Sequence, residues 1–162
     1  MRVVSITVDP ARVEAVVGFE AAEPLRTSSF PRLSERALRL LPGLRGHRCD
    51  NGAGITFADE MADTEIAHLL EHVAVELMAL SGSPTTLAGR TQWDFRADGH
   101  GVFRVLMEYD DDLVAIGALK EAMEIVDWLT GAGSGHADPV ANEAGVPDVR
   151  SAVGRLRTAR RR

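Results

Sequence analysis

The stretch of residues 63–81 constrains the fold of this chain more than any other segment. Between residues 66 and 80 only four side chains are polar, and in an α-helix they fall within one sector of roughly 140°. The opposite side of that helix is apolar, with Leu69, Leu70, Val73, Leu77 and Leu80. We therefore predict a core helix that begins near Asp63 or Thr64 and ends at Gly82.

Weaker patterns predict the elements around this helix. The predicted elements are strands at residues 2–8 and 102–109, helices at 34–41 and 113–129, and a short strand near Arg90. Residues 11–29 give mixed signals. This order of elements predicts an α+β fold, with a small, mostly antiparallel sheet and two long helices packed on one face.

Composition and spacing divide the chain into two parts. With 162 residues, of which 45% are apolar, the chain is long enough for one domain with a core, which we place at residues 1–131. Residues 132–162 begin as a Gly/Ala-rich linker and end in a stretch, 155–162, with five arginines. We predict that this second part is a linker followed by a basic, disordered tail, although residues 149–162 could equally form a short basic helix.

Charge and hydropathy exclude several classes of protein. The net charge of −6 argues against a nucleic-acid partner, which selects a basic surface. No signal peptide is evident, and no apolar run approaches the roughly 20 residues that cross a membrane. The single cysteine, Cys49, excludes an intrachain disulfide. We expect a cytoplasmic protein without a membrane partner.

The polar side of the helix at residues 63–81 has a metal-binding pattern, with His68, Glu71, His72 and Glu76. Histidines four residues apart can direct their nitrogens at one metal ion, and a neighbouring glutamate can act as general base on a metal-bound water. This is the H-x-x-E-H arrangement of inverted zinc hydrolases. The alternative is a solvated polar face with ordinary i,i+4 pairs. The absence of Lys and Arg from residues 63–83 favours the metal site.

A zinc site needs a further protein ligand. We favour Glu108, because the strand at residues 102–109 can lie beside the helix; Glu76 is the alternative, although it is two turns from His68. Further candidates are Glu121 and Glu124 on the second long helix, and His47 with Cys49, whose thiolate would suit zinc. For the last two, a loop that simply packs against the helix is the simpler interpretation. Trp93 and Phe95 could line a groove or pack in the core.

Four segments resemble cyanophycin synthetases in their order and spacing. They are Leu-Pro-Gly-Leu-Arg-Gly-His-Arg-Cys at residues 41–49, His-Leu-Leu-Glu-His-Val-Ala-Val-Glu-Leu at 68–77, Gly-Arg-Thr at 89–91, and Gly-Val-Phe through Glu-Tyr at 101–109. The similarity is to the N-terminal domain of that family and covers roughly residues 40–129. The chain departs from the family at residues 52–55 and 62–64 and at Met78, where glutamine is usual.

The resemblance implies both a pathway and a site. Cyanophycin synthetases polymerise aspartate and arginine, and their N-terminal domain is followed by ATP-grasp and Mur-ligase-like domains. Since this chain ends before either, we expect a stand-alone domain that is not itself a synthetase. In many members the domain has a metallopeptidase-like site, which implies His68 and His72 as zinc ligands, Glu71 as base and Arg90 near the substrate.

Two hypotheses follow for function. The first is a zinc-dependent metallohydrolase acting on cyanophycin-like peptides or related amide bonds. The second is a non-catalytic binding or accessory module for an Asp/Arg-rich polymer or for a separate ligase. An intact Glu71 favours the first. The sequence leaves the oligomeric state open, a homo-oligomer included.

Overall fold

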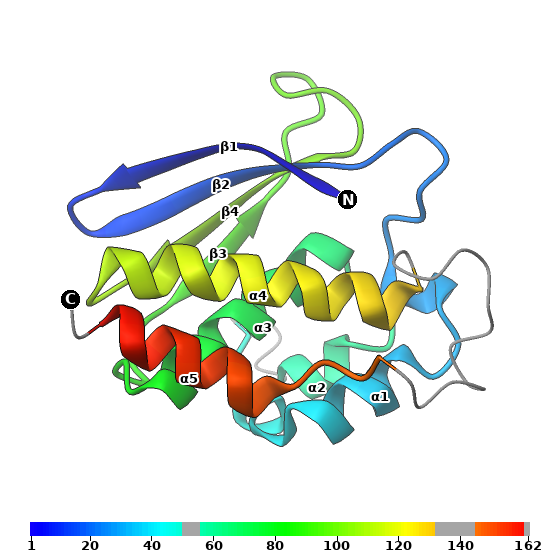
Figure 1. Ribbon diagram of the computed structural model, residues 1–162. Coiled ribbons are helices and arrows are strands. Elements are labelled where there is room, and N and C mark those ends of the chain that lie inside the picture. Colours follow the sequence, from blue (N-terminus) through cyan, green and yellow to red (C-terminus); the bar gives the residue numbers. More distant parts are fainter. Residues whose placement is uncertain (50–55, 132–144, 161–162) are drawn as a thin grey trace.

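The computed structural model describes residues 1–49, 56–131 and 145–160 (Figure 1). Its strands are β1 (Arg2–Asp9), β2 (Arg12–Gly18), β3 (Gly89–Gln92) and β4 (Val102–Glu108). Its α-helices are α1 (Leu33–Leu40), α2 (Phe57–Glu60), α3 (Ile66–Ser81), α4 (Asp112–Thr130) and α5 (Val149–Ala159), and two 3-10 helices lie at Thr27–Ser29 and Pro42–Gly46. The predicted α+β class is confirmed.

The strands form one antiparallel sheet in the order β1-β2-β4-β3, as predicted for a small antiparallel sheet. On β4 the alternate residues Phe103, Val105 and Met107 are buried, as the apolar alternation requires. Strand β2 lies within residues 11–29, where the sequence pattern was mixed. Its buried residues, Val13, Ala15 and Val17, also alternate, but alanine and the final Gly18 have weak strand preference.

Helices α3 and α4 pack together beside the sheet and supply much of the core (Figure 1). Helix α3 has Glu65 at its N-cap position, where the sequence predicted Asp63 or Thr64. It ends at Gly82, which has the left-handed conformation with φ 106°. Helix α4 begins at Asp112, one residue before the predicted start, and its N-cap residue Asp111 accepts a hydrogen bond from the Val114 amide through its side chain. One predicted core residue, Leu80, is instead 38% exposed.

In the described residues 145–160 the structure has the helical alternative and not a disordered tail. Helix α5 packs on α3 and α4 and buries three apolar side chains: Ala152, Val153 and Leu156. Arg155 donates two hydrogen bonds to the carboxylate of Glu121 on α4, at 2.7 and 2.6 Å. These three residues form only a short apolar stripe, at positions 152, 153 and 156, and it is surrounded by arginines. The pattern was therefore too weak to predict that this helix packs on the domain. The predicted linker, residues 132–144, lies outside the described residues.

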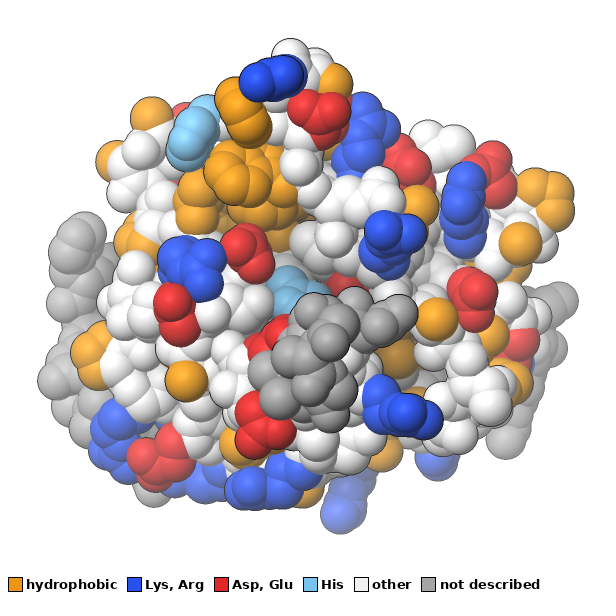
Figure 2. All heavy atoms as spheres, turned by 180° about the vertical axis from the view of Figure 1, so that it is seen from behind, with side chains coloured by type: hydrophobic (Ala, Val, Ile, Leu, Met, Phe, Trp, Pro, Cys, Tyr) orange, Lys and Arg blue, Asp and Glu red, His pale blue; other side chains and the backbone are white. Residues whose placement is uncertain are grey.

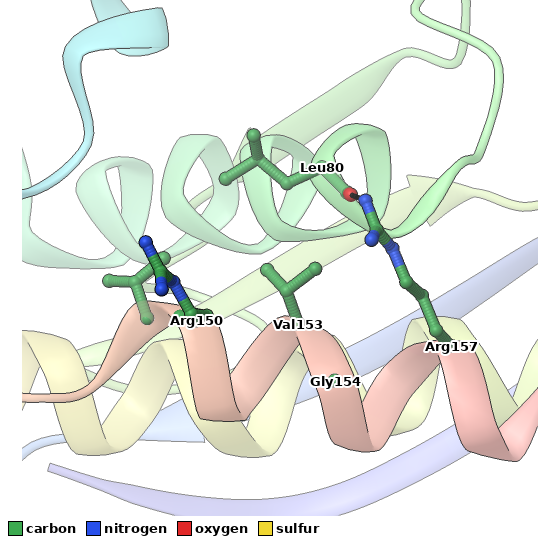
Figure 3. Close-up of a pocket in the computed structure, with 6 residues that line it drawn as sticks. Leu80, Arg150, Val153, Gly154 and Arg157 are labelled. Carbon is green, nitrogen blue, oxygen red and sulfur yellow. Dashed lines mark hydrogen bonds between the residues drawn. The ribbon is translucent and has the colours of Figure 1, made fainter.

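A shallow groove runs between α5 and the C-terminal end of α3 (Figure 3). It is lined by Leu80, Val149, Arg150, Val153, Gly154 and Arg157. Arg157 crosses to α3, where it donates a hydrogen bond to the Leu80 carbonyl oxygen at 2.8 Å. The exposure of Leu80 is therefore explained by its position at the edge of this groove. In the parts of the chain that are described, no helix is both long and apolar enough to cross a membrane.

Candidate metal-binding site

Three potential metal ligands converge beside the N-terminal half of α3. The nitrogen or sulfur atoms of Cys49, His68 and His72 all lie within 4.8 Å of one another. The Nε2 atoms of His68 and His72 are 3.1 Å apart, and Cys49 Sγ is 3.3 Å from His68 Nε2. The structure therefore brings together the two predicted histidines and, as a third group, the cysteine.

Local folding explains why Cys49 reaches the helix. The 3-10 helix Pro42–Gly46 directs the following residues towards α3, and the His47 carbonyl accepts a hydrogen bond from the Phe57 amide at 3.0 Å. Arg48 forms an antiparallel bridge with Thr56. The ring of Phe57 stacks on His72, with centroids 3.8 Å apart, and so closes one side of the cluster.

The histidines of this cluster are held in a buried, largely uncharged state. Burial, together with the nearby His68 and His47, lowers the pKa of His72 to about 2. Burial also lowers the pKa of His68, although Glu60 and Glu65 oppose this shift. Neutral imidazole is the form that binds metal ions, so the environment suits a ligand role at neutral pH.

Glu71 is 4% exposed and faces β3. Its Oε2 accepts a hydrogen bond from the Thr91 hydroxyl at 2.7 Å, and its Oε1 is 4.0 Å from His72 Nε2. A Cβ atom at Gly89 would collide with the Glu71 carboxylate, so only glycine allows this strand to approach so closely. Burial raises the pKa of Glu71 to about 7, against the hydrogen bond from Thr91 and the nearby His47, which lower it.

The predicted third ligands lie elsewhere. Glu108 is on the face of β4 opposite the buried Met107; it is exposed, and its carboxylate accepts a hydrogen bond from the Ala88 amide at 3.0 Å. Glu76 is buried on α3, where its Oε2 lies 3.0 Å from His47 Nε2. The structure does not place either carboxylate in the convergent group. Of the other candidates on α4, Glu121 is bound by Arg155 and Glu124 is exposed.

Arg90 lies between the two residues of β3 that face Glu71. Because Gly89 and Thr91 point towards α3, the alternation of the strand directs Arg90 to the other face, where it is exposed. It is therefore not part of the cluster that contains His68 and His72.

Cys49 was among the further candidates from the sequence, but the pattern on α3 could not select it, because it lies in a distant segment. A signal was present in residues 41–49, where a histidine and a cysteine follow a Pro-Gly turn. No sequence pattern indicated Glu60, on α2, as a candidate ligand. Its Oε2 nevertheless lies 3.0 Å from Cys49 Sγ and 3.9 Å from His68 Nδ1. Seen from behind, a histidine is visible near the middle of the surface, with acidic side chains beside it and hydrophobic ones above it (Figure 2).

The fold and the cluster define a small α+β domain that gathers a cysteine and two histidines along the polar side of a core helix. This chain belongs to the family of cyanophycin synthase-like N-terminal domains, whose model matches residues 14–131. The resemblance of the four sequence segments to this family is thereby confirmed. Helix α5 lies outside the matched residues.

Two similar proteins are both named cyanophycin synthetase. The chain is 32% identical over 108 residues to a cyanophycin synthetase of Synechocystis sp.. These matched residues make up 66% of this chain and 12% of that protein. It is 27% identical over 115 residues to the cyanophycin synthetase of Geminocystis herdmanii, covering 70% of this chain and 13% of the relative. The chain therefore spans only about an eighth of the length of these relatives.

The prediction of a zinc-dependent, metallopeptidase-like hydrolase is wrong. The family and the curated relatives are named for synthesis, and a convergent group of side chains is not enough to define a hydrolase. The assignment of Glu71 as general base belonged to that prediction. The structure gives this buried carboxylate a packing position between α3 and β3, which is compatible with a role in the fold.

The raised pKa of Glu71 predicts a pH-dependent stability. Protonated Glu71 makes its full contribution to the free energy of unfolding below pH 4.5, its ordinary pKa. This contribution is lost as the pH rises to about 7, because between these two values the folded state binds more protons than the unfolded chain. In metal-free protein we expect Glu71→Gln to be up to about 3 kcal/mol more stable than wild type above pH 7. The two proteins should converge below pH 4.5.

Urea unfolding of both proteins from pH 4 to 8, with a chelator present, measures this difference. Thr91→Val serves as a control, since it removes the hydroxyl that stabilises the carboxylate and should steepen the pH dependence. Parallel pH profiles for wild type and Glu71→Gln would contradict the prediction.

Proposed function

We propose that this domain is a non-catalytic binding module of cyanophycin synthesis, which holds an Asp/Arg-rich polymer next to a structural zinc site. The observation that carries the proposal is a pair of exposed aromatic rings at the end of β3. Trp93 is 47% exposed and Phe95 is 55% exposed, and their ring centroids are 5.9 Å apart. Exposed aromatic pairs on an ordered surface are typical of binding sites.

The ring of Trp93 is held firmly in place. It stacks on the buried Phe103 with centroids 5.9 Å apart and an interplanar angle of 28°, and His100 meets it edge-on at 5.7 Å. Two residues earlier, Thr91 is hydrogen-bonded to Glu71 on α3. The aromatic pair is thus anchored both to the sheet and to the helix that carries the histidines.

This surface suits a ligand that carries guanidinium groups. The guanidinium carbon of Arg96 already lies 5.7 Å from the Phe95 centroid, so the ring is accessible to a cation of this kind. Guanidinium groups stack on the faces of tryptophan and phenylalanine, at a gain of about 0.5–1 kcal/mol for an exposed pair. Carboxylates of the same polymer can pair with Arg96 or with the exposed Arg90.

The cluster on α3 fits a zinc ion. Two nitrogens bound to one tetrahedral zinc stand about 3.3 Å apart, and a nitrogen and a sulfur about 3.6 Å apart, values close to those of the cluster. Cys49, His68 and His72 would hold the ion, and Glu60, whose Oε2 lies 3.0 Å from Cys49 Sγ, is a carboxylate that could complete the set. Four protein ligands close a site to substrate, which supports a structural role: fastening residues 47–49 to α3.

Polymer binding is tested by calorimetry with peptides of β-linked Asp-Arg units. We expect wild type to bind them and Trp93→Ala to bind about two- to fivefold more weakly, since stacking on a held ring is lost. Trp93→Phe should retain most of the affinity. A wild-type protein that binds no Asp-Arg peptide would overturn the proposal.

Two controls separate stacking from general charge effects. Poly-aspartate, which lacks guanidinium groups, should bind much more weakly than the Asp-Arg peptide. Glu124→Ala changes an exposed charge on α4 and should leave binding unchanged. Equal binding of poly-aspartate would show that the aromatic pair does not select the ligand.

A further inference from the structure

A chain of three side chains continues from the candidate ligands towards the 3-10 helix Pro42–Gly46. His72 Nδ1 lies 3.0 Å from His47 Nδ1, and His47 Nε2 lies 3.0 Å from Glu76 Oε2. All three side chains are buried or nearly so, with side-chain exposures of 7%, 15% and 10% for His72, His47 and Glu76. Water therefore competes little for these hydrogen bonds.

The chemistry of the three groups fixes the direction of the chain. A carboxylate only accepts hydrogen bonds, so Nε2 of His47 must carry the proton that faces Glu76. Neutral His47 then has a bare Nδ1, which accepts a hydrogen bond from Nδ1–H of His72. It follows that Nε2 of His72 has a free lone pair, and this is the atom that faces His68 Nε2.

On the other side of the site, Thr64 prepares His68 in the same way. The Thr64 hydroxyl lies 2.8 Å from His68 Nδ1 and can accept a proton from it, which leaves His68 Nε2 bare. Two lone pairs that face each other at 3.1 Å repel unless a cation lies at the site. In metal-free protein a proton on His68 Nε2 serves this purpose by donating to His72 Nε2, and the Thr64 hydroxyl then donates to His68 Nδ1; a metal ion takes the place of that proton.

We propose that His47 and Glu76 are positioning residues that fix the tautomer of His72, so that its Nε2 is available to a metal ion. They contact the ligand rather than the ion. The inference rests on the zinc site described under the proposed function. Partners of this kind set ring orientation and ligand basicity in metal sites, and their loss lowers metal affinity about 10- to 100-fold.

The position of Gly43 gives an independent argument for this chain. A Cβ atom at residue 43 would collide with the Glu76 carboxylate, so the 3-10 helix can approach Glu76 only with glycine there. The 3-10 helix that precedes His47 thus also leaves space for Glu76, the hydrogen-bond acceptor of His47. Gly43→Ala is therefore a variant that displaces the carboxylate of Glu76 without altering any ligand or hydrogen-bonding group.

The experiment measures zinc affinity by competition with a chromophoric chelator. We expect His47→Phe, Glu76→Leu and Gly43→Ala each to bind zinc about 10- to 100-fold more weakly than wild type. Glu76→Gln should bind nearly as well, because its amide oxygen still accepts the proton of His47. The visible spectrum of bound Co²⁺ should be the same in all variants, since the ligand set is unchanged.

Imidazole ¹⁵N NMR of wild type decides the inference even where a variant folds poorly or wild type binds no zinc. With or without metal, His72 should carry its proton on Nδ1. A proton on Nε2 of His72 in the metal-free protein would overturn the inference, and so would unchanged zinc affinity in both Glu76→Leu and His47→Phe. A changed Co²⁺ spectrum in His47→Phe would make His47 a ligand instead. Failure of wild type to bind zinc, with the proton on Nδ1, would refute only the zinc site.

Discussion

Leu156→Ala is expected to destabilise the protein by about 2–5 kcal/mol. Leu156 is 2% exposed and packs against α4, although it belongs to a helix outside the residues that match the family. Its Cδ2 is so close to α4 that a Cβ atom at Gly117 would stand 2.7 Å from it. A side chain packed this tightly leaves a cavity when it is truncated.

Urea or guanidinium unfolding of wild type and variant measures this loss. Arg150→Ala is the matched control in the same helix, since Arg150 is exposed and its replacement should change the free energy of unfolding by less than about 0.5 kcal/mol. A loss for Leu156→Ala no larger than that of the control would mean that α5 does not dock in solution.

The parts of the fold with a strong period were predictable from the sequence. The uniform apolar side of α3 and the alternation of Phe103, Val105 and Met107 in β4 each specify one element and one buried face. The docking of helix α5 on α3 and α4 was not predicted, because its apolar stripe is short and surrounded by arginines, whose partners, such as Glu121, are distant in sequence. Local patterns carry no information about such partners.

The candidate site was predictable only where its residues lie on one helix. His68 and His72 are one turn apart, so the helix period alone brings them together. Cys49 approaches them from a separate segment, and choosing it over Glu108 required knowing that Glu108 lies on the opposite face of the sheet. The glycines at 43 and 89 could be understood only from the carboxylates that they accommodate.

Zinc is expected to stabilise wild type strongly and the Cys49→Ala variant hardly at all. An ion that binds only the folded state adds about 4 kcal/mol when its free concentration is 1,000 times Kd. Thermal unfolding with buffered zinc and with a chelator measures this increment. Comparing increments removes any effect of the substitution on the metal-free protein. An equal increment in Cys49→Ala would show that the ion binds elsewhere.

The most direct test is the zinc content of the purified domain. The protein is incubated with zinc, passed through gel filtration to remove unbound metal, and analysed by inductively coupled plasma mass spectrometry. With Cys49, His68 and His72 as the ligands, wild type should retain about one zinc ion per chain, and Cys49→Ala and His68→Ala should retain almost none. A wild type that retains no zinc, or variants that retain as much as wild type, would contradict the site.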